Sequence, residues 1–379
     1  MTHSMASQEF RALFPALDRW AWFDTPAAPP AAGPVADALT AALEDWRSGR
    51  FSWQGWDSAP GRCREAFAGL AGVDPATVSL HGSAAEGVAT VAQSLPPGSV
   101  VIPGSDYRSV LFPLLALDQD RNPVLRAGGP GGADATEHIA AMIRQDTVLV
   151  AVSQTLTSAG CRLDLARLAA AAHAAGARLL VDMTQSFGVL DWDLAALGAD
   201  HVIVHGYKWL LCPRGAAWMA TRADRLDRLD PLMPNWKSTS PPHGYFGGDL
   251  AMLASTAARL DASPAWLSWI GAEAALEIMS RLDPAEVEAH CTGLARAWSQ
   301  AVRELGFTSA SGEQQSHIAV AEMPGPAAGL SERLENSGIK ASVTGRRLRI
   351  GVHYFNTADD VDRMTDVLKG IAHGHHADS

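Results

Sequence analysis

Two short apolar segments, each followed by polar residues, lie within residues 177–208, which read ARLLVDMTQSFGVLDWDLAALGADHVIVHGYK. Residues 177–181 and 201–204 have the composition of strands covered on both faces, as in a parallel sheet. Asp182 directly follows the first segment, and Lys208 closes the motif HGYK after the second. Because open α/β sheets bind ligands at the carboxyl ends of their strands, we expect both side chains in one site.

Lys208 stands out because lysine is rare in this chain. The other lysines are Lys237, Lys340 and Lys369, and every other cation apart from histidine is an arginine. Lysine, unlike arginine, can lose its proton and form a Schiff base with a carbonyl group. An ordinary charged lysine on a loop is the alternative, but a carboxylate at the end of a neighbouring strand favours a chemical role.

Asp182 and Lys208 are the two groups that pyridoxal phosphate (PLP) requires. The lysine holds the aldehyde of the cofactor, and the carboxylate keeps the ring nitrogen protonated, so that the ring withdraws electrons from the substrate Cα. Gln185 is placed to donate a hydrogen bond to the ring hydroxyl. We therefore predict Lys208 and Asp182 as catalytic, cofactor-binding residues and PLP as the cofactor.

These segments resemble the class V aminotransferase family of PLP enzymes. The resemblance rests on VDMTQS at residues 181–186 and HGYKWLLCPRG at residues 205–215. The order Tyr-Lys-Trp followed by Pro-Arg-Gly is most similar to the isopenicillin N epimerase-like and kynureninase-like branch. The resemblance extends from WFDTP (residues 22–26) to RIGVHYFNT (residues 349–357). It implies fold type I, a small-molecule substrate of the amino-acid type and a homodimer with active sites at the interface.

The phosphate of the cofactor is expected at residues 82–86, GSAAE, between a predicted strand and a predicted helix. The Ser83 hydroxyl, the backbone N–H groups of Ala84 and Ala85, and the helix dipole together favour an anion. A simple helix cap is the alternative, and Ala85 replaces the threonine usual in the family. His205 and Tyr207 are expected to add donors from the other side.

The family resemblance assigns further residues by position. Tyr107 matches the histidine that stacks on the pyridine ring, although packing at an interface is an alternative. Thr157 stands where many relatives have an asparagine near the ring hydroxyl. Arg349 matches the arginine that binds the substrate α-carboxylate, with Gly351 in place of a serine. Ser263 matches a threonine that reaches the phosphate of the neighbouring subunit.

A chain of 379 residues exceeds what a single hydrophobic core usually supports, so two domains are expected. Residues 1–30 are interpreted as an extended N-terminal arm. Alternating strands and helices over residues 31–261 predict a large α/β PLP-binding domain with a mainly parallel sheet flanked by helices. Residues 262–379 predict a smaller C-terminal α+β domain.

Aromatic residues gather in stretches that we interpret as loops: Trp53, Trp56, Trp236, Tyr245 and Phe246. If they line a pocket, the substrate is larger than a simple amino acid, and the alternative is packing. The histidines His373, His375 and His376 are interpreted as a solvated tail, and the glycine-rich loop at residues 128–132 lacks the lysine of a nucleotide-binding loop.

Charge and composition exclude several classes of partner. A net charge of −11 argues against nucleic acid and anionic membrane. No segment of the sequence is long and apolar enough to span a bilayer, and we expect no signal peptide. The four cysteines are scattered without metal-ligand spacing, which favours a cytoplasmic protein with reduced thiols and no metal site.

The cysteine positions also bear on the reaction. Cysteine desulfurases use a nucleophilic cysteine in the C-terminal domain, but no cysteine follows Cys291. Transamination, β-elimination at a C–S bond, epimerisation and retro-Claisen cleavage stay open. We favour a C–S lyase acting on a modified or S-conjugated amino acid in a natural-product biosynthetic pathway, with an aminotransferase or epimerase as the alternative.

Two other classes of protein are less compatible with the sequence. A non-catalytic binding module would not need Asp182, Gln185, Lys208 and Arg349 together. A nicotinamide-dependent oxidoreductase would carry a Gly-x-Gly-x-x-Gly motif after its first strand, and the sequence lacks one.

Overall fold

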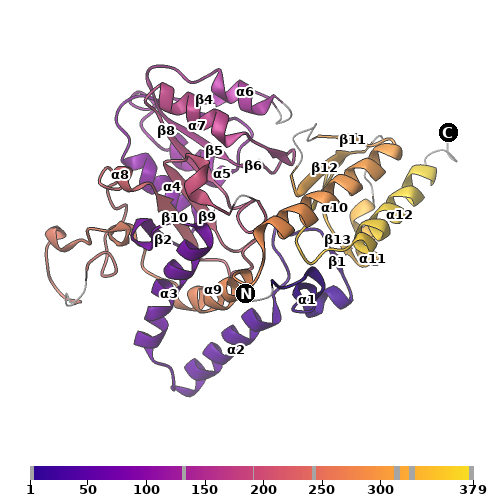
Figure 1. The fold of residues 1–379 in the computed structure, drawn as a ribbon, viewed down its shortest axis with the longest axis horizontal. Coiled ribbons are helices and arrows are strands. Elements are labelled where there is room, and N and C mark those ends of the chain that lie inside the picture. Colours follow the sequence, from indigo (N-terminus) through magenta and orange to yellow (C-terminus); the bar gives the residue numbers. More distant parts are fainter. Residues whose placement is uncertain are drawn as a thin grey trace.

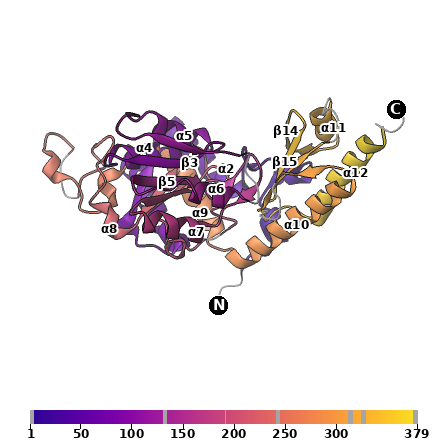
Figure 2. The same cartoon turned by 90° about the horizontal axis from the view of Figure 1, so that it is seen from above.

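The computed structural model describes residues 4–129, 134–190, 192–240, 245–310, 316–323 and 329–374. Part of the glycine-rich loop at residues 128–132 and the histidines His375 and His376 lie outside these ranges, as does the side chain of His373. The chain forms a large sheet with helices around it and a smaller sheet formed mainly by the C-terminal part, side by side in both views (Figures 1 and 2). No helix of the described residues has the length and apolar character needed to span a membrane.

The large sheet has seven strands in the order β2-β10-β9-β8-β5-β3-β4. Strands β9, β8, β5, β3 and β4 run parallel, whereas β10 is antiparallel to both β9 and β2. The strands are β2 (Val78–His81), β3 (Ser99–Pro103), β4 (Val124–Ala127), β5 (Thr147–Ser153), β8 (Arg178–Asp182), β9 (His201–His205) and β10 (Ala217–Thr221).

Helices cover both faces of this sheet, as the continuous apolar strands predict. Alternate residues of β8 enter different apolar clusters: Leu179 and Val181 pack in one and Leu180 in the other. The surrounding elements are α2 (Gly33–Ser48), α3 (Trp53–Ala71), η2 (Pro75–Thr77), α4 (Ala84–Gln93), α5 (Arg108–Leu115), α6 (Ala135–Ala140), α7 (Leu165–Ala174), η3 (Leu194–Leu197), α8 (Ala223–Leu226), η4 (Leu250–Met252) and η5 (Ala257–Leu260). A short hairpin of β6 (Thr155–Leu156) and β7 (Cys161–Arg162) follows β5.

The smaller sheet is antiparallel, in the order β11-β12-β15-β14. Helices α10 and α12 run along one side of it (Figure 2). The C-terminal elements are α9 (Trp266–Met279), α10 (Pro284–Glu304), β11 (Thr308–Ser309), β12 (Ile318–Glu322), α11 (Leu330–Asn336), β13 (Ile339–Lys340), β14 (Ser342–Thr344), β15 (Arg347–Gly351) and α12 (Ala358–Gly374). The predicted fold class is thereby confirmed.

The first thirty residues differ from the extended arm expected. They contain α1 (Ser7–Arg11), η1 (Pro15–Asp18) and β1 (Ala21–Trp22), which pairs in parallel with β13. Phe10 and Phe14 are fully buried, and the Phe14 ring centre lies 4.9 Å from that of Phe355. The N-terminal segment is folded and not extended because these aromatic rings are buried against the C-terminal part. Helix α9 packs against α2 and α3. The domain boundaries at residues 31 and 262 stay predictions.

Candidate active site

Two adjoining cavities lie where the parallel strands end. The inner cavity has a volume of about 190 Å³ and the outer cavity about 600 Å³. Residues common to both linings are Tyr107, Thr157, Gln185, Tyr207, Lys208 and Arg214. Most of the residues that the sequence analysis predicted for the site line these two cavities, and their functional roles stay predictions.

Asp182 is the last residue of β8, and its side chain lines the inner cavity. Its Oδ1 accepts a hydrogen bond from the Thr184 backbone N–H at 2.8 Å. Burial raises the pKa of the Asp182 carboxyl, while hydrogen bonds from Thr184 and the charge of Lys208 act in the opposite direction. Thr184 also accepts from the His205 backbone N–H at 3.0 Å, which ties the end of β8 to the end of β9.

Lys208 follows β9 in a tight turn. A Cβ atom at Gly206 would lie 2.8 Å from both Cys212 Sγ and a ring carbon of Trp218, so this turn requires glycine. Burial lowers the pKa of Lys208 to about 8; the charge of Asp182 opposes this shift, and Arg349 and Arg214 add to it. A neutral, nucleophilic amine is thus accessible near neutral pH.

Asp106 is a buried carboxylate at the site to which the sequence analysis assigned no role. Its Oδ1 accepts from the Tyr107 backbone N–H at 2.6 Å and from Ser153 Oγ at 2.5 Å, and its Oδ2 accepts from the Ser153 N–H at 2.8 Å. Burial raises the pKa of Asp106 to about 6, and the charge of Asp182 contributes. Asp106 joins the loop after β3 to the end of β5 and so positions Tyr107. Its place directly before an expected stacking residue was the available sequence signal.

The expected phosphate site lies at the start of α4. Ser83, Ala84 and Ala85 line the inner cavity, and Ser83 is the N-cap, accepting from the Glu86 N–H at 3.3 Å. His205 lines the same cavity; burial lowers its pKa to about 4, so the ring is neutral at neutral pH. These residues lie together at the inner cavity, and their contacts with a phosphate stay predictions.

Gln185 has structural partners at both ends of its amide. Its Nε2 donates to the Pro26 carbonyl at 3.0 Å, and its Oε1 accepts from Trp209 Nε1 at 2.9 Å. One amide N–H is left for the ring hydroxyl that the sequence analysis assigned to it. Thr157 lines both cavities, in keeping with its expected place.

Arg349 lies in β15 and lines the outer cavity. Its Nη2 is 3.7 Å from Asp24 Oδ1. Burial lowers the pKa of Arg349, and the nearby Asp24 carboxylate acts in the opposite direction and raises it. A Cβ atom at Gly351 would lie 2.4 Å from two ring carbons of Pro26 and 3.0 Å from Trp209. Any side chain at this position, including the serine of the family motif, would collide with Pro26 as it is placed here.

Arg214 lines both cavities but was quoted in the sequence motif without a role. Its guanidinium carbon lies 5.0 Å from the centre of the Tyr207 ring. Among the described residues no carboxylate lies within ion-pair distance of Arg214. The same is true of Arg108, which lines the outer cavity. Its position between Pro213 and Gly215 gave no local signal of what its side chain contacts.

Ser263 is exposed and lines neither cavity. The preceding residue, Ala262, donates its backbone N–H to the Leu80 carbonyl at 2.8 Å, beside the end of β2. Within one chain, therefore, Ser263 does not form part of the site. Its contact with the phosphate of a partner subunit stays a prediction.

Trp53 and Trp56 were interpreted as loop residues, and this is wrong. Helix α3 begins at Trp53 because Ser52 caps it, accepting from the Gly55 N–H at 3.2 Å. Their rings pack in an aromatic cluster: Trp53 lies 6.3 Å from Trp266, 6.5 Å from Trp236 and 5.7 Å from Tyr245. None of these rings lines either cavity. Phe246 does not line them either and is almost fully exposed.

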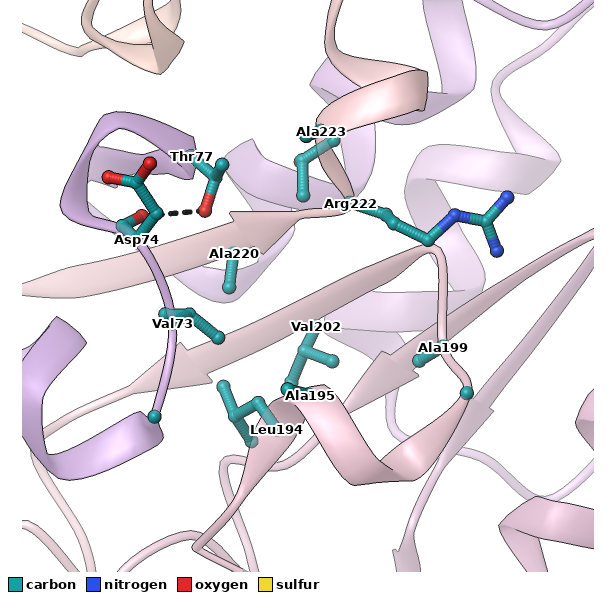
Figure 3. A pocket seen from close by; sticks show the side chains of 13 residues that line it. Val73, Asp74, Thr77, Leu194, Ala195, Ala199, Val202, Ala220, Arg222 and Ala223 are labelled. Carbon is teal, nitrogen blue, oxygen red and sulfur yellow. Dashed lines mark hydrogen bonds between the residues drawn. The ribbon is translucent and has the colours of Figure 1, made fainter.

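A further cavity of about 300 Å³ lies at the opposite ends of the strands, near the start of β9 (Figure 3). Its wall is largely apolar, with Val73, Leu194 and Val202. Arg222, at its edge, is paired with Asp200 and with Asp224. Asp74, a carboxylate among the described lining residues, accepts from the Ala76 N–H at 2.9 Å as the N-cap of η2 and so has a structural role.

The residues of the inner cavity fit PLP. A buried carboxylate stands at one strand end for the ring nitrogen, and a lysine amine of lowered pKa stands at the next strand end for the aldehyde. A helix N-terminus with a serine cap provides donors for an anion. The aromatic ring of Tyr107 lies on the same cavity, with Lys208 Nζ 5.2 Å from its centre.

Comparison with known proteins agrees with this geometry. The model of the aminotransferase class-V family matches residues 57–364. The chain is 24% identical to a probable cysteine desulfurase of Methanothermobacter thermautotrophicus, over 97% of this chain and 98% of that protein. It is 27% identical to isopenicillin N epimerase of Streptomyces clavuligerus, over 82% of this chain and 84% of the epimerase.

Solved structures show the same fold. Cysteine desulfurase from Thermococcus onnurineus superposes with a TM-score of 0.83 at 19% identity, covering 99% of this chain and all of that one. The cystine C–S lyase C-DES, in complex with its product cysteine persulfide, gives 0.82 at 21% identity, covering 94% of this chain and 99% of the lyase. The family match, the fold and the cavity together establish that this chain belongs to the class V aminotransferase family of PLP-dependent enzymes.

Proposed function

We propose that this enzyme is a C–S lyase, which removes the Cα proton of an S-substituted cysteine-type substrate and expels the sulfur group by β-elimination. The observation that carries the proposal is the place of Lys208. Burial lowers the pKa of its amine to about 8, and Lys208 lines both the inner cavity, with Asp182, and the outer cavity of about 600 Å³, with Arg349. That cavity is large enough for an amino acid with a bulky S-substituent, as in a modified amino acid of a biosynthetic pathway.

When bound, PLP supplies an electron sink for the electrons of the broken Cα–H bond. Arg349 is the group that binds the substrate α-carboxylate, because its guanidinium lines the outer cavity and forks onto carboxylates. Once the substrate amine has displaced it from the cofactor, Lys208 Nζ would be free to take the Cα proton as general base. Asp182 keeps the ring nitrogen protonated through its buried charge.

The rest of the reaction is an elimination. The Cβ–S bond breaks, and its electron pair leaves with the sulfur as a thiolate or sulfenate, which takes up a proton. The released aminoacrylate then reacts with water to give a keto acid and ammonia. No oxidant or reductant is consumed.

The cysteines support elimination over the persulfide chemistry of a desulfurase. The sequence contains Cys63, Cys161, Cys212 and Cys291, all of them buried. None lines either cavity, and burial raises the pKa of Cys212, the one nearest to Lys208 in sequence, well above its usual value. A sulfur leaving the substrate therefore has no thiolate of this chain to accept it.

The test is turnover of S-substituted L-cysteines by the holoenzyme without an added keto acid. We expect thiol, keto acid and ammonia in equal amounts over many turnovers, without accumulation of pyridoxamine phosphate, and no turnover with Lys208→Ala. One turnover followed by recovery on addition of pyruvate would identify an aminotransferase. Exchange of the Cα proton with solvent deuterium without thiol release would identify an epimerase.

A further inference from the structure

Cationic groups dominate the outer cavity. Arg108, Arg214, Arg349 and Lys208 all line it, in a protein whose net charge is −11. We propose that the substrate carries a second carboxylate and that Arg214 binds it. This inference rests on the proposed function in one respect, namely that Arg349 holds the α-carboxylate.

The acidic groups near this cavity are already engaged. Asp106 lines the wall, but its two oxygens accept from Ser153 and from the Tyr107 N–H. Asp24 lies 3.7 Å from Arg349 and offsets part of its charge. Arg214 and Arg108 have no such carboxylate partner among the described residues. Both arginines are exposed, so water covers their charges in the free chain, and an anionic group of the substrate would take the place of that water.

The backbone on both sides of Arg214 is held firmly by α9. A Cβ atom at Gly271 would lie 2.3 Å from the Pro213 ring, and the Ser268 hydroxyl donates to the Arg214 carbonyl at 2.8 Å. Gly215 has a φ of +111°, and a Cβ there would lie 2.7 Å from Ser268 Oγ. These contacts fix the segment that carries Arg214.

The Arg214 side chain is oriented as well. Its guanidinium lies 5.0 Å from the centre of the Tyr207 ring, an arrangement that holds a guanidinium plane while its N–H groups stay available. A preorganised arginine binds a carboxylate with a smaller loss of side-chain entropy. Arg214 is thus suited to select substrates by the group at the end of the substrate that is remote from the α-carboxylate.

Arg214 also lines the inner cavity, so the phosphate of PLP is the competing ligand. Two observations favour the substrate. The phosphate has the N-terminus of α4 with Ser83 at the inner cavity. The second arginine without a carboxylate partner, Arg108, lines only the outer cavity, so the excess of positive charge extends away from α4.

The experiment is calorimetric titration of the PLP-loaded enzyme with straight-chain dicarboxylates from succinate to suberate. Each dicarboxylate is compared with the monocarboxylate of the same chain length. Since a charge-assisted arginine–carboxylate pair is strong, we expect one dicarboxylate to bind about ten- to a hundredfold more tightly than its monocarboxylate counterpart. In Arg214→Gln that preference should vanish while monocarboxylate affinity is retained.

Arg346→Gln is the matched control, because Arg346 donates to the Met323 carbonyl and does not line the cavity. It should keep the wild-type preference, and Arg108→Gln should reduce the preference in part. The proposal is overturned if Arg214→Gln keeps the preference. It is also overturned if Arg214→Gln releases PLP on dialysis, because Arg214 would then bind the phosphate. Dissociation of the variant into monomers would overturn it too, because Arg214 would then belong to a contact between subunits. If dicarboxylates are preferred but no S-substituted cysteine is cleaved, the proposed lyase function fails and this inference stands.

Discussion

The ammonium nitrogen of Lys208 lies 5.2 Å from the centre of the Tyr107 ring. The two residues come from the loop after β3 and the turn after β9, and the sheet brings them to one cavity. Tyr107 is about half exposed, yet its backbone is fixed by Asp106. A planar cofactor held by Lys208 would therefore find an aromatic face already in position.

Removal of the Tyr107 ring should weaken cofactor binding. Tyr107→Ala loses an offset-stacking contact that contributes about 0.5–1.5 kcal/mol. We expect roughly a two- to tenfold higher dissociation constant for PLP, measured by fluorescence during dialysis, since about 1.4 kcal/mol is tenfold. Tyr107→Phe keeps the ring and should bind like wild type. Equal affinity of the alanine variant would assign Tyr107 to interface packing.

Loading of the apoenzyme should depend on pH through Lys208. Its pKa is lowered to about 8, so the neutral amine becomes abundant as pH rises through 8. The rate of PLP incorporation should rise up to about pH 8 and then level off, followed by the absorbance of the bound cofactor. A rate that rises without levelling well above pH 9 would contradict this assignment.

The attachment point itself can be mapped. Borohydride reduction should fix the cofactor to the peptide that contains Lys208, identified by mass spectrometry. Lys237→Ala is the control, because the Lys237 ammonium is paired with Asp57 at 3.0 Å. A label on the Lys237 peptide, or no label, would rule out Lys208.

Asp182→Asn should keep the fold and lose most turnover. Asparagine preserves the size of the side chain and can accept from the Thr184 N–H, which now bonds Asp182 at 2.8 Å. It lacks the charge that holds the ring proton, a charge-assisted bond of about 1.5–3 kcal/mol. We expect a decrease of roughly ten- to a hundredfold in kcat with unchanged circular dichroism. Near-normal activity would show that another group faces the ring nitrogen.

Arg349→Lys should lower substrate affinity without changing the spectrum of the free holoenzyme. Lysine keeps the charge but loses the bidentate fork, and it still faces Asp24, 3.7 Å from the present guanidinium. We expect KM for an α-amino acid substrate to increase about tenfold, measured by initial rates. An unchanged KM would place the α-carboxylate elsewhere.

Ser263 tests whether the site is shared between subunits. It is exposed and outside both cavities of its own chain, so any contact with a phosphate must come from a partner. We expect a dimer in analytical ultracentrifugation and weaker PLP retention in Ser263→Ala, with Ser280→Ala, a residue at the end of α9, as the control. A fully active monomer would contradict the shared site.

The sequence by itself determined the sheet and the core of the site. Residues 178–182 and 201–205 form strands because continuous apolar runs are stable only when both faces are covered. The polar residues that end these runs emerge at the same edge, so Asp182 and Lys208 meet. Local composition carries this information, because strand, turn and cap preferences act over a few neighbouring residues.

Only the tertiary structure decided what each side chain contacts. The amide of Gln185 is engaged by Pro26 and Trp209, and Asp106 bridges to Ser153. Within the described ranges no carboxylate pairs with Arg214, which stays exposed beside the Tyr207 ring. Such contacts join residues distant in the chain, and they depend on which side chains the packed fold brings within a few ångströms. Local pattern cannot encode that outcome.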